Sequence, residues 1–302
     1  MTHILIHEVG PRDGLQVEQR VVPTDTKLRW IEALMDSGLD LVQVGSFVHP
    51  EKVPQMADTD ELFRRLAGRK RSTGVVLSGL VLNERGLERA LACGVELVCM
   101  GVSASDTHSR KNTGMSTEEA TRRIIATALE ARKAGRRVQV SVQSAFGCGF
   151  EGPVDEDRLV RILEAYLAEG LHAISLADTA GHAHPPQVAD LIERLLRMEP
   201  TAEVTVHLHN TYGLGMANVY AALDAGARCI ETGFGGLGGC PFTKVAAGNV
   251  ATEDVVHGLQ RADLCTHIDL GALVAVARDV AAFLGRELPG CVYKTGPIGK
   301  EM

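Results

Sequence analysis

The sequence predicts an α/β protein, a (β/α)8 TIM barrel with a C-terminal helical extension. Eight short runs rich in β-branched residues alternate with stretches of helical periodicity, and several of those stretches end in a glycine just before the next run. Eight βα units in 302 residues fit this barrel, for which about 250 residues are typical. An open doubly wound sheet is the alternative. We predict the catalytic barrel over residues 1–265 and an extension packed on it over 266–302.

The elements are expected in a regular order along the chain. Strands are short apolar runs, as in parallel sheets that are covered on both faces. They are predicted at 4–8, 40–46, 74–81, 95–102, 137–144, 172–178, 204–210 and 227–233. Helices are predicted at 25–36, 59–66, 83–92, 116–133, 155–168, 187–197 and 214–225, then from about 253, and last at 270–284. The last helix exceeds the needs of eight βα units, so we expect it on the outside of the barrel.

Composition excludes several classes of function. The 31 basic and 38 acidic residues give a net charge of −7 without a basic block, which disfavours nucleic-acid binding. The apolar runs are shorter than the roughly 20 residues of a membrane-spanning helix. Seven cysteines without a CxxC pair, and a start that does not resemble a signal peptide, favour a reducing, cytoplasmic setting.

The barrel prediction locates the active site at the carboxyl ends of the strands. GPRDGLQ follows the first strand and brings Arg12 and Asp13 there. His207 and His209, two residues apart on the seventh strand, point to the same face. With Asn249 after the eighth strand, they form a mixed nitrogen and oxygen set that suits Mg²⁺ or Mn²⁺. A histidine pair alone is more often only hydrogen-bonded, but the added carboxylate favours a metal site.

A glycine-dense loop follows the eighth strand. Five of the seven residues in Gly233–Gly239 are glycine, and Cys240 comes next. The loop contains a literal GxGxxG, but a dinucleotide fingerprint belongs after a first strand and opens a helix. We interpret the loop as a flexible lid that carries a thiol. A small buried core cysteine is the alternative for Cys240.

Other polar residues near the strand ends give weaker signals. Asp178 is either a site carboxylate or the N-cap of a turn. Glu253 either orients Asn249 or only opens the next helix. Gln16 and Gln43 are expected near the barrel mouth. The loop histidines are expected to be solvated, namely His49, His182 and His184.

A resemblance to a known family is carried by five segments. They are VGPRDGLQ (9–16), SFVHPEKVPQM (46–56), SLADT (175–179), VHLHNTYG (206–213) and GGLGGCPF…AAGNVATED (235–254). In this order they resemble 3-hydroxy-3-methylglutaryl-CoA lyase and its relatives in the DRE-TIM metallolyase superfamily. The similarity spans nearly the whole chain.

The resemblance implies a chemistry and the residues that perform it. A divalent cation, Mg²⁺ or Mn²⁺, would be bound by Asp13, His207, His209 and Asn249. Arg12 would stabilise an enolate, and Cys240 would be a mobile acid or base. The same matching implies that Ser109, Lys111 and Asn112 lie near the CoA chain. We predict Asp178 and Glu253 as further catalytic residues and Gln16, Gln43 and Ser46 as further substrate-binding residues. The implied reaction cleaves a tertiary 3-hydroxyacyl-CoA, as in leucine degradation, within a homo-oligomer (a dimer or tetramer).

Two departures from the family pattern concern the substrate. The lyases usually carry a glutamate where this chain has Gln43, and their DTxGxGxP loop reads DTAGHAHP here, which adds His182 and His184. We therefore hypothesise citramalyl-CoA, cleaved to acetyl-CoA and pyruvate, as an alternative to hydroxymethylglutaryl-CoA. Other readings are a Claisen-type synthase, which usually lacks the loop cysteine, and a non-haem Fe(II) oxygenase, normally built on a β sandwich. A catalytically inert binding protein is the last alternative.

Overall fold

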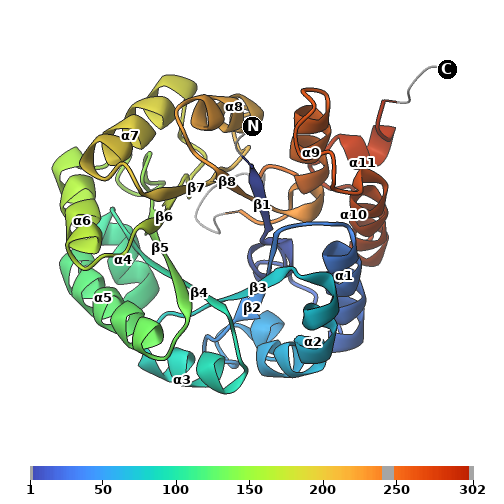
Figure 1. Ribbon diagram of the computed structural model, residues 1–302, viewed down its shortest axis with the longest axis horizontal. Coiled ribbons are helices and arrows are strands. Elements are labelled where there is room, and N and C mark those ends of the chain that lie inside the picture. Colours follow the sequence, from blue (N-terminus) through green and yellow to red (C-terminus); the bar gives the residue numbers. More distant parts are fainter. Residues whose placement is uncertain (1–2, 240–247, 299–302) are drawn as a thin grey trace.

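Eight parallel strands close into a barrel in the order of the chain in the computed structural model, which describes residues 3–239 and 248–298 except the side chains of 70–73 (Figure 1). The closure pairs Leu5–Glu8 of β1 with Cys229–Thr232 of β8. The predicted TIM barrel is therefore confirmed, and the open-sheet alternative is wrong.

Each of the eight predicted strands is present, most of them shorter than predicted. The strands are β1 (Leu5–Glu8), β2 (Leu41–Ser46), β3 (Val76–Leu80), β4 (Leu97–Ser103), β5 (Arg137–Gln143), β6 (Ala173–Ala177), β7 (Glu203–His207) and β8 (Cys229–Thr232). The lost residues lie mainly at the ends, where the chain leaves the ladder to enter or leave a loop. His209 is one of them, and it lies in the loop just beyond β7.

The seven helices predicted between the strands are also present and surround the barrel (Figure 1). They are α1 (Thr24–Asp36), α2 (Thr59–Thr73), α3 (Glu84–Ala92), α5 (Thr117–Lys133), α6 (Glu156–Ala168), α7 (Pro185–Met198) and α8 (Gly215–Asp224). None of the helices within the described ranges is long and apolar enough to cross a membrane.

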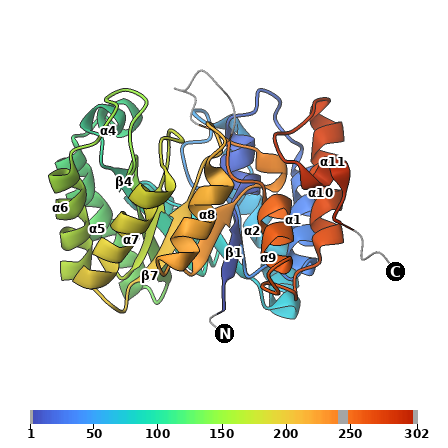
Figure 2. The ribbon, with the colours of Figure 1, turned by 90° about the horizontal axis from the view of Figure 1, so that it is seen from above.

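The sequence patterns did not predict four helical elements that follow strands, of which two are the short 3-10 turns η2 (Pro54–Met56) and η3 (Phe234–Gly236). Helix α4 (Asp106–Thr113) has no apolar stripe, so periodicity could not reveal it. It is defined by its ends instead, because Ser105 caps its first turn and Gly114 adopts a φ of 76° after its last. The π-helix η1 (Gly10–Gly14) follows β1. Helix α4 and η1 both lie at the carboxyl end of the barrel, opposite the N-terminus (Figure 2).

Three helices follow β8: α9 (Thr252–Gln260), α10 (Leu270–Leu284) and the short α11 (Val292–Thr295). Helix α10 packs on the outside of α1, as Figure 1 shows. Trp30 of α1 donates a hydrogen bond from Nε1 to Asp279 Oδ2 at 2.6 Å, and its ring meets Phe283 edge-on at 5.6 Å. These contacts hold α10 beside the seam between β1 and β8.

Candidate active site

The four predicted metal ligands meet at the carboxyl ends of β1, β7 and β8. The Nε2 atoms of His207 and His209 are 3.1 Å apart, and Oδ2 of Asp13 lies 4.0 Å from His207 Nε2. Asn249 forms a backbone bridge with His209 and donates from Nδ2 to Asp13 Oδ2 at 2.9 Å. Residues 236 positions apart in the chain therefore share one site.

Glycines make room for this arrangement. Gly10 begins η1, and a Cβ there would lie 2.5 Å from Oε1 of Glu8 and 2.7 Å from the Phe234 ring. Gly238 has a φ of 104°, and a Cβ there would lie 2.5 Å from Asn249 Nδ2 and 2.9 Å from Asp13 Oδ2. Only glycine lets the backbone pass this close to the two polar side chains.

The electrostatics of the cluster suit a cation. Burial lowers the pKa of His209 to about 4, so that its imidazole is neutral at pH 7. Burial alone would raise the pKa of Asp13, but Arg12 and the two imidazoles outweigh it and lower that pKa to about 2. One ionised carboxylate therefore faces a neutral His209 imidazole that can offer a lone pair. Burial would lower the pKa of His207, but its hydrogen bond with Glu231 and the charges of Asp13 and Glu231 outweigh burial and raise that pKa.

The residues present fit a divalent cation. Single ligand atoms of Asp13, His207 and His209 lie within 4.8 Å of one another. Asn249 Oδ1 is buried and has no hydrogen-bond partner among the described residues, which leaves it free to bind an ion. A carboxylate, two imidazoles and an amide oxygen are ligands that Mg²⁺, Mn²⁺ and other first-row divalent ions accept.

Arg12 is held from two sides beside this cluster. Its Nε donates to Oε1 of Gln43, which is buried in β2, and its Nη1 donates to Asp13 Oδ1 at 2.5 Å. Gln16 Nε2 donates to the same Asp13 oxygen at 3.3 Å. The structure thus places three predicted substrate-binding residues, Arg12, Gln16 and Gln43, next to the metal ligands.

Glu231 is a site residue that the sequence reasoning missed. Its Oε2 lies 2.9 Å from His207 Nδ1, and its Oε1 lies 3.7 Å from Nδ1 of His7, whose Nε2 is 2.7 Å from Ser78 Oγ. Burial would raise the pKa of Glu231, but the hydrogen bond with His207 and the charges of His207, His7 and Arg12 together outweigh burial and lower that pKa. The hydrogen bond between the two side chains depends on the strand register that sets His207 opposite Glu231. In the sequence, the signal that could have indicated Glu231 as a site residue was an acidic residue inside a predicted strand.

Asp178 lies just after β6, and its two oxygens have different surroundings. Oδ1 accepts the backbone N–H of His182 at 2.8 Å, which is the turn-capping role that the sequence allowed. Oδ2 is buried without a hydrogen-bond partner in the described ranges. Burial raises the pKa of Asp178 to about 6. The backbone N–H of Asp178 donates to the His207 carbonyl at 2.8 Å, so this carboxyl borders the site.

Glu253 lies in the first turn of α9, and its carboxyl contacts the glycine loop. Among the described residues it makes no hydrogen bond to the Asn249 side chain. Its Oε2 accepts the backbone N–H of Gly235 at 3.0 Å. Glu8, which the sequence reasoning also missed, accepts the backbone N–H of Phe234 at 3.0 Å. Burial raises the pKa of Glu8 to about 7 and that of Glu253 to about 8. Two buried carboxyls therefore hold the start of the loop.

The remaining predicted residues make no hydrogen bond to the four metal ligands among the described residues. Ser46 ends β2, and its Oγ is buried without a partner in the described part of the chain. Lys111 and Asn112 lie on α4, where Lys111 Nζ sits 3.8 Å from the centre of the Phe150 ring. Asn112 Nδ2 lies 3.0 Å from His108 Nε2 on the same helix, so in the described part of the chain both residues contact the surroundings of α4 and not the metal ligands. Cys240 lies outside the described residues.

The predicted loop histidines have different surroundings. His49 and His184 are exposed, and His184 Nδ1 caps α7 by accepting the backbone N–H of Gln187 at 3.4 Å. His182 is half-buried, and its ring centre lies 5.9 Å from that of Tyr212. The expectation of solvated histidines therefore holds for His49 and His184 but is only partly met by His182.

Fold and site together define a class of protein: a TIM-barrel enzyme with a candidate divalent-cation site at the carboxyl ends of its strands. The HMGL-like family model matches residues 3–280. The hydroxymethylglutaryl-CoA lyase YngG of Bacillus subtilis is 38% identical over 286 residues, 95% of each chain. The (R)-citramalyl-CoA lyase of Chloroflexus aurantiacus is 41% identical over 305 residues, which cover 99% of this chain and 96% of that one.

Solved structures agree with these matches. The HMG-CoA lyase of Bacillus subtilis superposes with a TM-score of 0.92 at 37% identity, over 98% of both chains. An HMG-CoA lyase from Acinetobacter baumannii, in complex with coenzyme A and 3-methylmalate, gives a TM-score of 0.91 at 36% identity, over 99% of this chain and 97% of that one. The chain belongs to the HMGL-like family, and the resemblance to hydroxymethylglutaryl-CoA lyases is confirmed. It is a carbon–carbon lyase that acts on a CoA ester.

Proposed function

We propose that this lyase cleaves 3-hydroxy-3-methylglutaryl-CoA to acetyl-CoA and acetoacetate with a divalent cation, Mg²⁺ or Mn²⁺. The observation that carries the proposal is the convergence of Asp13, His207, His209 and Asn249 beside Arg12. A cation bound by these four residues would polarise the hydroxyl and carboxylate oxygens of the substrate.

Arg12 has the geometry of an enolate-stabilising group. When the C2–C3 bond breaks, its electron pair passes to the thioester, and negative charge develops on the thioester oxygen. The guanidinium is held in advance by Gln43 and Asp13, so it does not reorganise as the charge appears. We therefore assign Arg12 to the thioester oxygen.

Asp178 is our candidate for the group that takes the hydroxyl proton. The pKa values of Asp13 and His209 are too low for a useful base at pH 7. Burial brings the pKa of Asp178 to about 6, and its Oδ2 has no other hydrogen-bond partner within the described residues. The Cys240 thiol, on the family resemblance, would then protonate C2 of the enolate to give acetyl-CoA. Glu253 would act indirectly, by holding the loop that precedes Cys240.

A second candidate substrate is citramalyl-CoA, which would give acetyl-CoA and pyruvate. Its carboxylate arm is one methylene shorter than that of hydroxymethylglutaryl-CoA, so the carboxylate lies closer to the reacting carbon. Gln43 favours this candidate because a neutral amide beside Arg12 can donate a hydrogen bond to a carboxylate, whereas an ionised glutamate repels one. The 41% identity to an (R)-citramalyl-CoA lyase supports the same candidate.

Assays of the two products separate the candidates. Acetoacetate and pyruvate are each reduced by a different NADH-linked dehydrogenase, so both reactions can be followed on one preparation. We expect turnover to vanish after chelation and to return with Mg²⁺ or Mn²⁺. If hydroxymethylglutaryl-CoA is turned over at least as efficiently as citramalyl-CoA, the altered-specificity hypothesis fails. If neither ester is cleaved in the presence of metal, the assignment to both substrates fails.

Further proposals concern the binding of the CoA chain, the C-terminal residues and the assembly and location of the enzyme. We assign the CoA chain to the rim formed by α4, where Lys111 and Asn112 lie. We propose that residues 266–302 form an extension of the barrel and not an independent unit, since α10 packs on α1. A cytoplasmic homo-oligomer, a dimer or tetramer, that acts in leucine degradation is consistent with the family resemblance.

A further inference from the structure

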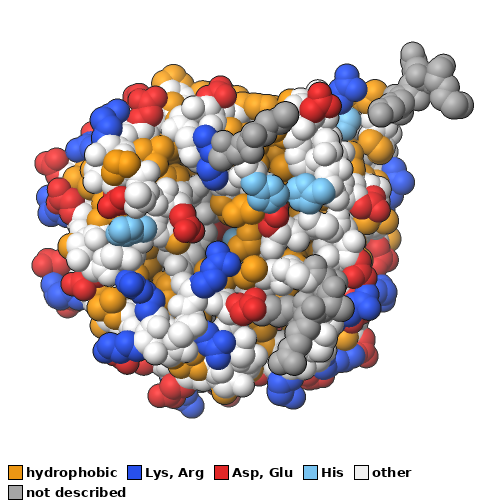
Figure 3. Space-filling view, in the orientation of Figure 1, with side chains coloured by type: hydrophobic (Ala, Val, Ile, Leu, Met, Phe, Trp, Pro, Cys, Tyr) orange, Lys and Arg blue, Asp and Glu red, His pale blue; other side chains and the backbone are white. Residues whose placement is uncertain are grey.

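A second cluster of potential metal ligands lies at the opposite end of the barrel. His3 precedes β1, Asp40 precedes β2, and His267 lies in the loop between α9 and α10. Single ligand atoms of the three residues lie within 4.8 Å of one another. His3 Nε2 is 2.9 Å from Asp40 Oδ1, and the ring centres of the two histidines are 5.4 Å apart. Figure 3 shows the face of the molecule on which the strands begin, where histidine side chains lie among charged and apolar ones.

The backbone around this cluster is held in place. The second oxygen of Asp40, Oδ2, accepts the backbone N–H of Ile6 at 3.0 Å. Asp269 N donates to the Ser37 carbonyl at 2.7 Å, which ties the loop of His267 to the end of α1. Gly38 permits this approach, because a Cβ there would lie 2.9 Å from the His267 carbonyl oxygen. Hydrogen bonds of the fold therefore hold the three segments next to one another.

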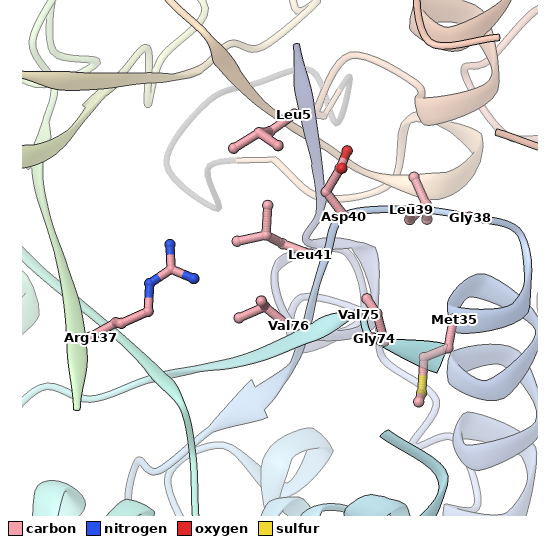
Figure 4. Close-up of a pocket in the computed structure, with 10 residues that line it drawn as sticks. All are labelled: Leu5, Met35, Gly38, Leu39, Asp40, Leu41, Gly74, Val75, Val76 and Arg137. Atoms are coloured by element: carbon pink, nitrogen blue, oxygen red, sulfur yellow. The ribbon is translucent and has the colours of Figure 1, made fainter. Parts of the chain in front are cut away.

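The cluster is accessible to an ion. His3 and His267 are exposed, and the His3 side chain is 61% exposed. Asp40 lines a cavity of about 380 Å³ together with Leu5, Leu41 and Arg137 (Figure 4). A tetrahedral zinc ion with bonds of 2.0–2.1 Å needs ligand atoms about 3.3 Å apart, so rotations of exposed side chains are enough to complete the site.

We propose that His3, Asp40 and His267 form a Zn²⁺ site that joins the N-terminal segment, the turn before β2 and the C-terminal extension. Two imidazole nitrogens and one carboxylate oxygen are a ligand set that Zn²⁺ accepts, with water in the fourth position. An ion bound to three separate segments stabilises the folded chain, because those segments converge in the folded state alone. The site does not depend on the proposed reaction, since its residues lie at the other end of the strands.

Zinc stoichiometry tests the site without an activity assay. The full-length protein is dialysed against buffered Zn²⁺, and bound zinc per chain is measured by atomic emission. If the candidate active site also takes zinc, we expect two ions for the wild type and one for His3→Ala. Because His3 is exposed, its replacement leaves the fold intact. His267→Gln gives a second, independent variant with the same expected loss. His172→Ala is the matched control and retains both ions, because His172 is a partly exposed histidine whose Nε2 lies 4.0 Å from Glu199 Oε2, away from the cluster.

Each possible zinc stoichiometry leads to a different conclusion. Equal zinc content in wild type and His3→Ala overturns the proposal, as does an equal loss in His172→Ala. One ion in the wild type and none in His3→Ala supports this site and instead counts against zinc in the candidate active site. Thermal unfolding gives a second readout, in which zinc raises the Tm of the wild type more than that of His3→Ala. Equal Tm shifts in the two proteins would also overturn the proposal.

Discussion

Glu231→Gln tests how the active site prepares His207 to bind metal. The wild-type carboxylate accepts a hydrogen bond from His207 Nδ1 at 2.9 Å, which leaves the lone pair on Nε2 to face Asp13 and His209. Glutamine has the same size and can still accept that bond, but it lacks the charge that makes the imidazole a stronger ligand. The fold is preserved while the electronic effect is removed.

The expected magnitude follows from the buried geometry. A hydrogen bond to a charged group contributes about 1.5–3 kcal/mol, roughly twice a neutral one. Loss of the charge should therefore cost about half of that, about 0.8–1.5 kcal/mol of binding free energy, which is a roughly 4- to 13-fold weaker Kd for the divalent cation. We expect kcat at saturating metal to fall less than metal affinity, because Glu231 acts through His207.

Metal affinity is measured by titrating the chelated protein with Mn²⁺ and following the free ion by paramagnetic resonance. Glu203→Gln is the matched control, since Glu203 is exposed at the opposite end of β7. Its Kd should equal that of the wild type. A Kd for Glu231→Gln within twofold of the wild-type value would refute the idea that this carboxylate tunes His207.

Three further predictions concern the glycine loop, the buried acids and the extension. Gly238→Ala should lower kcat/KM by about 100-fold or more, because its Cβ would clash with Asn249 and Asp13 at the reacting centre. Gly94→Ala is the matched control, because Gly94 also has a positive φ, of 72°, but has open space where a Cβ would lie. This change should lower stability and leave steady-state kinetics unchanged. Equal kinetic losses in the two variants would show that backbone strain, and not the clash, is the cause. Glu8 and Glu253 have pKa values raised by burial to about 7 and about 8, so the folded state holds protons that the unfolded state releases above about pH 4.5. Stability should therefore fall as pH rises from about 4.5 to 8. Glu253→Gln should flatten this slope and, at pH 8, increase the free energy of unfolding by an amount on the order of 4 kcal/mol, seen as a higher Tm. An unchanged pH profile of Tm would contradict the assignment. Trp30→Ala should cost about 3–5 kcal/mol in urea unfolding, because a fully buried ring and its bond to Asp279 are lost, whereas a cost below about 1 kcal/mol would mean that α10 is not held by this contact.

Much of the site was predictable because barrel geometry places every strand end on one face. Asp13, His207, His209 and Asn249 each follow or end a predicted strand, and their convergence needed no knowledge of side-chain contacts. The sequence left two alternative roles open for Asp178 and two for Glu253, and the reason is physical. Whether a carboxyl after a strand caps a turn or faces a site depends on which backbone N–H groups lie within reach, as Oδ1 of Asp178 and Oε2 of Glu253 show.

Hydrophobic periodicity and glycine caps are local signals, so they predicted the barrel, the order of its elements and the strand ends that carry the chemistry without knowledge of the fold. The tertiary structure decided which residues meet across the chain. Glu231 reaches His207 through the register of β7 and β8, and Glu8 reaches Phe234 because β1 closes on β8. The packing of the extension also brings together His3, Asp40 and His267 at the far end of the barrel, and no pattern along the chain indicates this convergence.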